Sequence, residues 1–151
     1  MGMFKTSEKM EEVLGGFFKL MGDTPVIADK LLKSKLVIRF SYTDPDLVVV
    51  VDCSGEKIDV RPNDTDSKAI VEMSMSADIA HRFWFGMVNL TKALTRKEMI
   101  AKGPIPKVLK LLPAIKPSYA MYPQYLEANG FGEYNITKAY TPPTPTPTPT
   151  A

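Results

Sequence analysis

The sequence has one cysteine and one histidine, and both shortages limit the chemistry that the chain can perform. With Cys53 alone, no disulfide can form within the chain, and nothing indicates an oxidising compartment. No serine, cysteine or carboxylate stands in a context that marks it as a catalytic partner of His81. The glycines form no phosphate-binding loop, and no Cys-x-x-Cys or His-x-x-x-His spacing indicates a metal site. We therefore expect no enzymatic activity, no cofactor and no metal.

Long apolar runs are also missing. The longest run in the strand region, 47–51, is far shorter than the ~18 residues that cross a bilayer. The first residues mix Met, Phe, Lys and Glu and lack the apolar core of a signal peptide. The net charge of +2 is too small to imply a nucleic-acid partner. These features favour a cytoplasmic protein.

The composition is that of a globular domain, with 44% hydrophobic and 24% charged residues in 151 positions. Residues 141–151 are only threonine, proline and alanine, which cannot form a buried core. We predict one domain over residues 1–140 and an extended, polyproline-like tail over 141–151.

Helical spacing marks the N-terminal part of the chain. Apolar residues recur every three or four positions from Met10 to Met21, and a helix over this stretch ends at Gly22. The pair Gly15-Gly16 inside it indicates a kink or a close backbone contact. Thr24-Pro25 then begins a second helix.

From residue 35 the period changes to two, which is typical of strands. Alternating or apolar segments at 36–42, 47–53, 58–60 and 69–75 are joined by short polar turns, including one at Asn63–Ser67. Such a succession predicts mainly antiparallel neighbours. A helix starts at Ser76 and Asp78, 97–103 predicts a short fifth strand, and Pro104 and Pro106 introduce a further helix. Later prolines, Pro123 among them, are expected to break the remainder into short helices.

Two features are more informative than the rest. Methionines recur on the fourth and fifth strands and on the helix between them, at Met73, Met75, Met87 and Met99, and methionine suits adaptable apolar surfaces. The segment 102–116 combines an apolar face with lysines, as do helices that rest on a membrane or cover a pocket. The plainer alternatives are an ordinary core and a solvated lysine face.

The order of these elements resembles the sterol carrier protein 2-like family. The resemblance lies in the run 72–79 (Glu-Met-Ser-Met-Ser-Ala-Asp-Ile), in Phe83-Trp-Phe-Gly86, in Lys92-Ala-Leu94 and in Lys102-Gly103. It covers about Leu31 to Leu112. The sequence departs from the family pattern at two places, at Thr95-Arg96, where a glycine is often found, and at Pro104 and Pro106, which follow Gly103.

The resemblance implies an α+β fold: a five-stranded, mainly antiparallel sheet with helices packed on one side. It also implies an apolar tunnel between sheet and helices that accepts fatty acids, acyl-coenzyme A, phospholipids or sterols without catalysis. On this basis we expect a protein that binds a lipid-like ligand, and its transfer within the cell is the activity that the resemblance suggests. The residues expected to line the ligand site are Met73, Met75, Phe83, Trp84, Met87, Met99, Ile105, Val108, Leu109 and Leu112.

Three lysines, Lys102, Lys107 and Lys110, are expected to contact an anionic head group or a membrane surface. The alternative function is an accessory domain whose apolar face binds a partner protein, such as a lipid-modifying enzyme.

Overall fold

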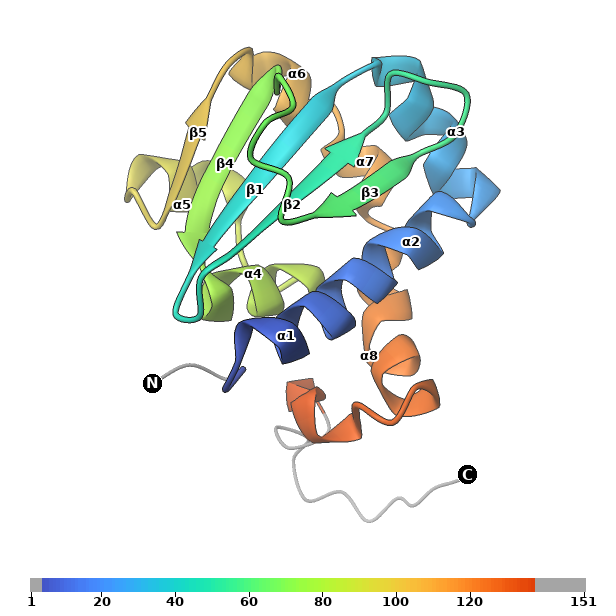
Figure 1. Cartoon of the computed structure of the whole chain (residues 1–151), viewed down its shortest axis with the longest axis vertical. Helices are drawn as coiled ribbons and strands as arrows, with labels where there is room; N and C mark the ends of the chain where they lie inside the picture. The colour runs from blue at the N-terminus through green and yellow to red at the C-terminus, as the bar shows by residue number, and fades with distance from the viewer. Residues whose placement is uncertain (1–3, 138–151) are drawn as a thin grey trace.

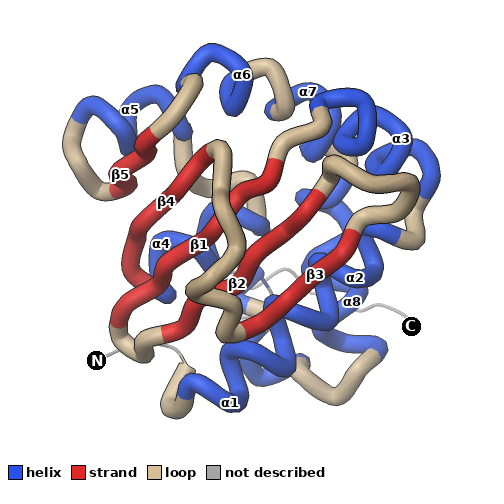
Figure 2. The backbone as a smooth tube through the Cα atoms, turned by 45° about the horizontal axis from the view of Figure 1, so that its top comes forward, coloured by secondary structure: helices blue, strands red, loops and turns tan. Residues whose placement is uncertain are grey.

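The computed structural model describes residues 4–137, and the predicted tail at 141–151 lies outside the described residues. Within this part of the chain one five-stranded sheet has the order β3-β2-β1-β4-β5 (Figure 1). Three of its four strand pairs are antiparallel, and helices lie against one face of it (Figures 1 and 2). The predicted α+β class and mainly antiparallel sheet are confirmed. The strands are β1 (Val37–Thr43), β2 (Leu47–Asp52), β3 (Asp59–Pro62), β4 (Val71–Ser76) and β5 (Met99–Lys102).

The position of β4 differs from the simplest interpretation of the sequence. Four strands joined by turns suggested neighbours in chain order, but β4 lies beside β1 and runs parallel to it. The connection 63–70 crosses the sheet face opposite the helices, in front of β2 and β1 in Figure 1. Arg39 of β1 donates hydrogen bonds to the backbone carbonyls of Asp64 and Ser67 and so holds the crossing chain. The sequence alone does not show this long-range contact.

The polar turn predicted at Asn63–Ser67 is part of that crossing. The Asp64 carboxylate accepts hydrogen bonds from the backbone of Asp66 and Ser67 and from the Arg61 side chain. Arg61 also pairs with Asp52 and Asp59. These contacts account for the acidic residues as anchors of a loop.

The N-terminal helix is continuous through three segments, α1 (Ser7–Met10), a π-helical turn η1 (Glu11–Gly15) and α2 (Gly16–Gly22). Gly16 is the close contact that the glycine pair predicted, because a Cβ there would collide with the hydroxyl of Tyr125. That hydroxyl donates to the carbonyl of Val13 at 2.8 Å. Helix α3 (Pro25–Ser34) follows, with Pro25 in its first turn as expected.

The first of the later helices, α4 (Ala77–Trp84), begins at the predicted capping residue Ser76. The Ser76 hydroxyl accepts a hydrogen bond from the backbone N–H of Ile79. Two details differ from the prediction. The helix after Gly103 divides into α6 (Ile105–Leu109) and α7 (Leu112–Ile115), and Pro123 lies inside α8 (Ser118–Ala128) instead of ending a helix. The later elements are α4 (Ala77–Trp84), α5 (Leu90–Thr95), α6 (Ile105–Leu109), α7 (Leu112–Ile115), α8 (Ser118–Ala128) and the 3₁₀ turn η2 (Gly132–Tyr134).

His81 is not near the surface, as a single helical histidine usually is; it is 1% exposed. Its Nδ1 lies 2.7 Å from the Tyr122 hydroxyl and its Nε2 2.7 Å from the Tyr134 carbonyl. Since a carbonyl only accepts, Nε2 donates and Nδ1 accepts from Tyr122. Burial lowers the pKa of His81 to about 4, so the ring stays neutral. This buried pair of bonds ties α4 to α8 and η2.

Candidate functional site

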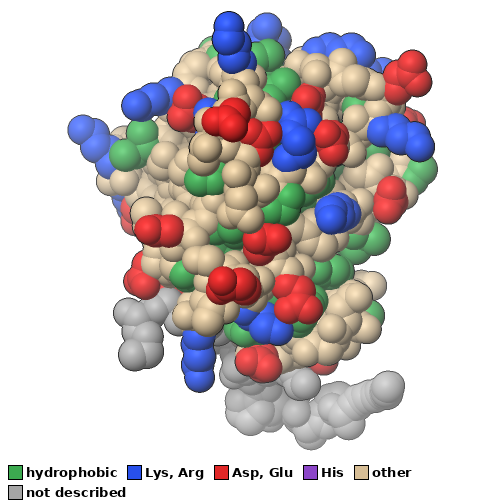
Figure 3. Space-filling model, in the orientation of Figure 1, with side chains coloured by type: hydrophobic (Ala, Val, Ile, Leu, Met, Phe, Trp, Pro, Cys, Tyr) green, Lys and Arg blue, Asp and Glu red, His purple; other side chains and the backbone are tan. Residues whose placement is uncertain are grey.

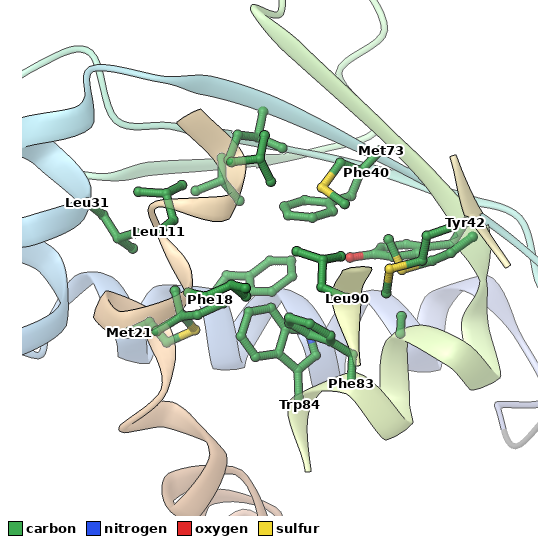
Figure 4. A pocket seen from close by; sticks show the side chains of 18 of the residues that line it. Phe18, Met21, Leu31, Phe40, Tyr42, Met73, Phe83, Trp84, Leu90 and Leu111 are labelled. Carbon is green, nitrogen blue, oxygen red and sulfur yellow. The ribbon is translucent and has the colours of Figure 1, made fainter. Parts of the chain in front are cut away.

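An apolar cavity of about 80 Å³ lies between the helix-covered face of the sheet and the helices (Figure 4). The strands contribute alternate residues, because side chains two positions apart share a face. Thus Phe40 and Tyr42 of β1 and Met73 and Met75 of β4 enter the same space. The lining residues are Phe18, Met21, Leu31, Ile38, Phe40, Tyr42, Val51, Cys53, Met73, Met75, Ala80, Phe83, Trp84, Leu90, Met99, Val108, Leu111, Leu112 and Ile115.

The wall carries no charged side chain and a single hydroxyl, that of Tyr42. The Cys53 thiol is protonated at neutral pH, because burial, together with the charge of Asp52, raises its pKa to about 11. The indole of Trp84 meets Phe83 edge to face with ring centroids 5.0 Å apart. Such a wall can hold an apolar guest, and it offers nothing to balance a buried charge.

Seven of the ten predicted lining residues meet in this cavity: Met73, Met75, Phe83, Trp84, Met99, Val108 and Leu112.

Three predicted residues lie elsewhere, which corrects those assignments. Met87 follows the end of α4 and is 46% exposed, because the chain turns at Gly86 with a positive φ and leaves the helical stripe. Ile105 lines a separate hollow beside β5, together with Leu94, Lys97 and Ile100. Leu109 ends α6 half-buried, outside the lining, because the helix breaks before its apolar face is complete.

The lining residues nearest to solvent lie on one segment. Leu111, Leu112 and Ile115 are half-buried, whereas nearly all other lining residues are buried. Lys107 on α6 and Lys110, which directly follows α6, are exposed on the same segment, and Lys102 is exposed at the end of β5. Residues 99–126 contain no aspartate or glutamate, so every charged side chain on the surface of this segment is basic. Figure 3 shows Lys and Arg side chains along the upper edge of the molecule, where α6 and α3 lie in Figure 1.

Twelve lining residues were not predicted, although for several of them the local sequence contains a pattern that could have indicated their position. The alternation Ile38, Phe40, Tyr42 defines one face of β1, which is the face that points to the helices. Leu90 follows Asn89, whose side chain accepts a hydrogen bond from the backbone of Lys92 and begins the unpredicted α5. The contributions of Phe18, Met21 and Leu31 depend on how the first helices dock, which no local pattern specifies.

The described residues contain no group of three or more His, Cys, Asp or Glu side chains that could hold a metal. His81 is occupied by its two hydrogen bonds and lies outside the cavity lining. No helix between residues 4 and 137 is long and apolar enough to span a membrane.

The fold and the site together define a class, a small α+β domain with an apolar cavity between its sheet and its helices. Within that class the chain belongs to the SCP-2 sterol transfer family, whose model matches residues 17–116. The predicted family is confirmed. Domains of this family are in general non-catalytic and bind lipid-like small molecules. No curated protein matches the chain.

Solved structures share this fold at low sequence identity. The sterol carrier protein domain 2 of Helicoverpa armigera is 16% identical, with a TM-score of 0.58 over 70% of this chain and 87% of that one. The UbiJ-SCP2 ubiquinone synthesis protein is 16% identical, with a TM-score of 0.52 over 74% and 89%. The apo sterol carrier protein 2 of Yarrowia lipolytica is 15% identical, with a TM-score of 0.50 over 74% and 88%.

Proposed function

We propose that the protein binds a lipid-like ligand in the apolar cavity and carries it without catalysing a reaction. The observation that carries this proposal is the wall itself, which is apolar and uncharged throughout and sits in the interior of the domain. Each methylene moved out of water contributes ~0.8 kcal/mol, so a chain of about ten methylenes would supply on the order of 8 kcal/mol before ordering costs.

The cavity must expand to hold such a ligand. At about 80 Å³ it is smaller than the ~300–1,000 Å³ of typical small-molecule sites. Four of its lining residues are methionines, Met21, Met73, Met75 and Met99. Unbranched thioether side chains change rotamer at low cost, so this wall is suited to repack around a guest. The half-buried α6–α7 segment is the part of the wall most able to move.

We further propose that Lys102, Lys107 and Lys110 contact an anionic head group or an anionic membrane while the apolar part of the ligand enters. Their exposure beside the half-buried part of the wall supports this role. A basic helix near a membrane gains about 1 kcal/mol for each lysine close to the surface.

The direct test is native mass spectrometry of the full chain purified from cells, with fluorescence titration of the same sample. Trp84 is the only tryptophan and lines the cavity, so all tryptophan emission of the protein comes from a residue of the site. We expect a copurifying apolar adduct, and a change in Trp84 emission when lipid is added to stripped protein. The absence of both an adduct and an emission change across fatty acids, alcohols and phospholipids would contradict the proposal.

A second candidate is an accessory domain whose apolar face binds a partner protein, for example a lipid-modifying enzyme. The observation behind it is the fold similarity to the UbiJ-SCP2 ubiquinone synthesis protein. Leu109→Asp separates the two candidates, because Leu109 is half-buried outside the cavity lining. Loss of a stoichiometric partner with lipid binding retained would favour the accessory role.

A further inference from the structure

The most unusual group in the cavity is the hydroxyl of Tyr42. The side chain is 3% exposed and belongs to β1, where its ring stacks on that of Phe40 with centroids 6.0 Å apart. Figure 4 shows its oxygen directed into the cavity, toward the side where Leu90 and Phe18 lie. Among residues 4–137 this oxygen has no hydrogen-bond partner, while no fully enclosed side-chain oxygen or nitrogen in that range lacks one. The oxygen is therefore open, and what it faces is the cavity.

Two other buried tyrosines show that this arrangement is not the rule in this protein. The Tyr122 hydroxyl donates to His81 Nδ1 at 2.7 Å, and the Tyr125 hydroxyl donates to the Val13 carbonyl at 2.8 Å. A buried hydroxyl without a partner costs about 1–3 kcal/mol. Phenylalanine would fill the same volume without that cost, so the oxygen of Tyr42 is the part of this wall that needs an explanation.

We propose that Tyr42 is the polar anchor of the cavity, and that the ligand is a neutral lipid with a hydroxyl or carbonyl oxygen at the end that enters first. This inference rests on the proposed lipid-binding function and narrows its ligand class. Tyr42 lies at one end of the cavity and Leu31 and Leu111 at the other (Figure 4). The oxygen of the ligand would thus lie beside Tyr42, away from the half-buried residues of the lining. The carbon skeleton of the ligand would run toward α6 and α7.

The charge of the wall favours a neutral oxygen function. No cation lines the cavity, so an ionised carboxylate at the Tyr42 end would be buried without a partner. Burial also raises the pKa of Tyr42 well above its usual value, which keeps the phenol neutral and able to donate. A neutral hydroxyl or carbonyl accepts from that phenol and satisfies both groups.

The test compares n-octane, 1-octanol and 2-octanone as probes on the full chain, with Trp84 fluorescence as the readout. Tyr42→Phe removes only the oxygen, and Tyr119→Phe is the matched control because Tyr119 lies outside the lining. We expect Tyr42→Phe to weaken 1-octanol and 2-octanone about 5-fold, the worth of one hydrogen bond, and to leave n-octane unchanged. Tyr119→Phe should bind all three like the wild type.

Equal affinities of wild type and Tyr42→Phe for 1-octanol would overturn the inference, and so would an equal loss for n-octane and 1-octanol. If fatty acids or phospholipids change the Trp84 emission of the wild type but 1-octanol and 2-octanone do not, the inference alone is overturned. If no lipid changes it and no adduct copurifies, the proposed function falls as well, which distinguishes the two failures. A measurement on the wild type guards against a folding defect in the variant. In protein labelled with ¹³C at tyrosine Cζ, 1-octanol should shift the Tyr42 resonance more than n-octane does.

Discussion

The interior of this protein has two unlike parts that share helix α4. Around His81, Tyr122, Tyr125, Tyr134 and Phe17, which we call the packed cluster, rings lie against one another and the polar atoms of His81, Tyr122 and Tyr125 are hydrogen-bonded. On the other side of α4, the cavity is lined by flexible methionines and one open hydroxyl. The side chains of the packed cluster are held by ring contacts and hydrogen bonds, whereas the cavity has free space and flexible methionine side chains around it.

The difference indicates a division of labour along one helix. His81 points into the packed cluster, and Ala80, Phe83 and Trp84 of the same helix line the cavity. Directional bonds fix α4 against α8 and η2, so repacking of the methionines on its other side need not disturb the fold. Changes in the packed cluster should therefore alter stability, and changes in the cavity should alter binding.

The largest expected effect is the pH dependence of the packed cluster. The pKa of His81 falls from its ordinary 6.5 to about 4 on folding. Between these two pH values the unfolded chain carries a proton on His81 and the folded chain does not. The resulting stability is complete above pH 6.5 and is lost as the pH falls toward 4, a difference of about 3 kcal/mol. Urea unfolding at pH 7, 5.5 and 4.5 measures it. His81 is the only histidine, so in His81→Gln the slope over this window should disappear, and a slope that persists would contradict the assignment.

A pair of adjacent glycines gives the next contrast. Gly16→Ala places a methyl group against the Tyr125 hydroxyl, which must then shift away from the Val13 carbonyl that it donates to. We expect the free energy of unfolding to fall by about 1–2 kcal/mol. Gly15→Ala is the matched control, because its Cβ meets nothing within 4 Å. It should raise stability by about 0.5–1 kcal/mol through helix propensity alone. Thermal unfolding of both variants checks the signs, and equal signs would show that the contact is not tight.

Filling the cavity should separate binding from stability. Ala80→Leu extends a side chain from α4 into the cavity, so we expect at least a roughly 10-fold loss of 1-octanol affinity with little change in thermal stability. Ala77→Leu is the control, because Ala77 is fully buried but does not line the cavity. Overpacking there should cost about 1–3 kcal/mol of stability. An Ala80→Leu protein that binds like the wild type would place the ligand elsewhere.

The smallest expected effect concerns the exposed lysines. Lys110→Gln should weaken binding of the protein to phosphatidylserine-containing vesicles about 5-fold at low salt, because one lysine near such a surface contributes about 1 kcal/mol. Lys19→Gln, an exposed lysine on α2, should leave vesicle binding unchanged. Cosedimentation with vesicles measures both, and equal losses would show that the contact depends on net charge only.

Local signals predicted much of this architecture. The period-two pattern predicted the strands, and Ser76 predicted the start of α4. The glycine pair predicted a kink or a close backbone contact, and the structure identifies Tyr125 as the residue in contact. β4 reaches its place beside β1 through a crossing chain that Arg39 binds from 25 and 28 residues away, and no local pattern encodes these contacts. For the same reason the β-strand and α4 parts of the cavity wall were predictable, whereas Phe18, Met21 and Leu31 were not.

The break after Leu109 and the burial of His81 are two further features that local sequence patterns did not predict. A helical pattern continued through Ile105, Leu109 and Leu112, but the chain stops and restarts near Lys110, so only part of that face reaches the cavity. The burial of His81 has no local signal in the sequence, because its partners, Tyr122 and Tyr134, come 41 and 53 residues later.

The most direct test of a guest-binding cavity is ¹³C-methyl NMR of the nine methionines during titration with 1-octanol. Met21, Met73, Met75 and Met99 line the cavity, whereas Met10 is buried outside the lining and Met87 is exposed at the surface. We expect the four lining methyls to shift together and saturably while Met10 and Met87 stay in place. Lining methyls that do not move, or shifts of equal size at all six positions, would contradict the account.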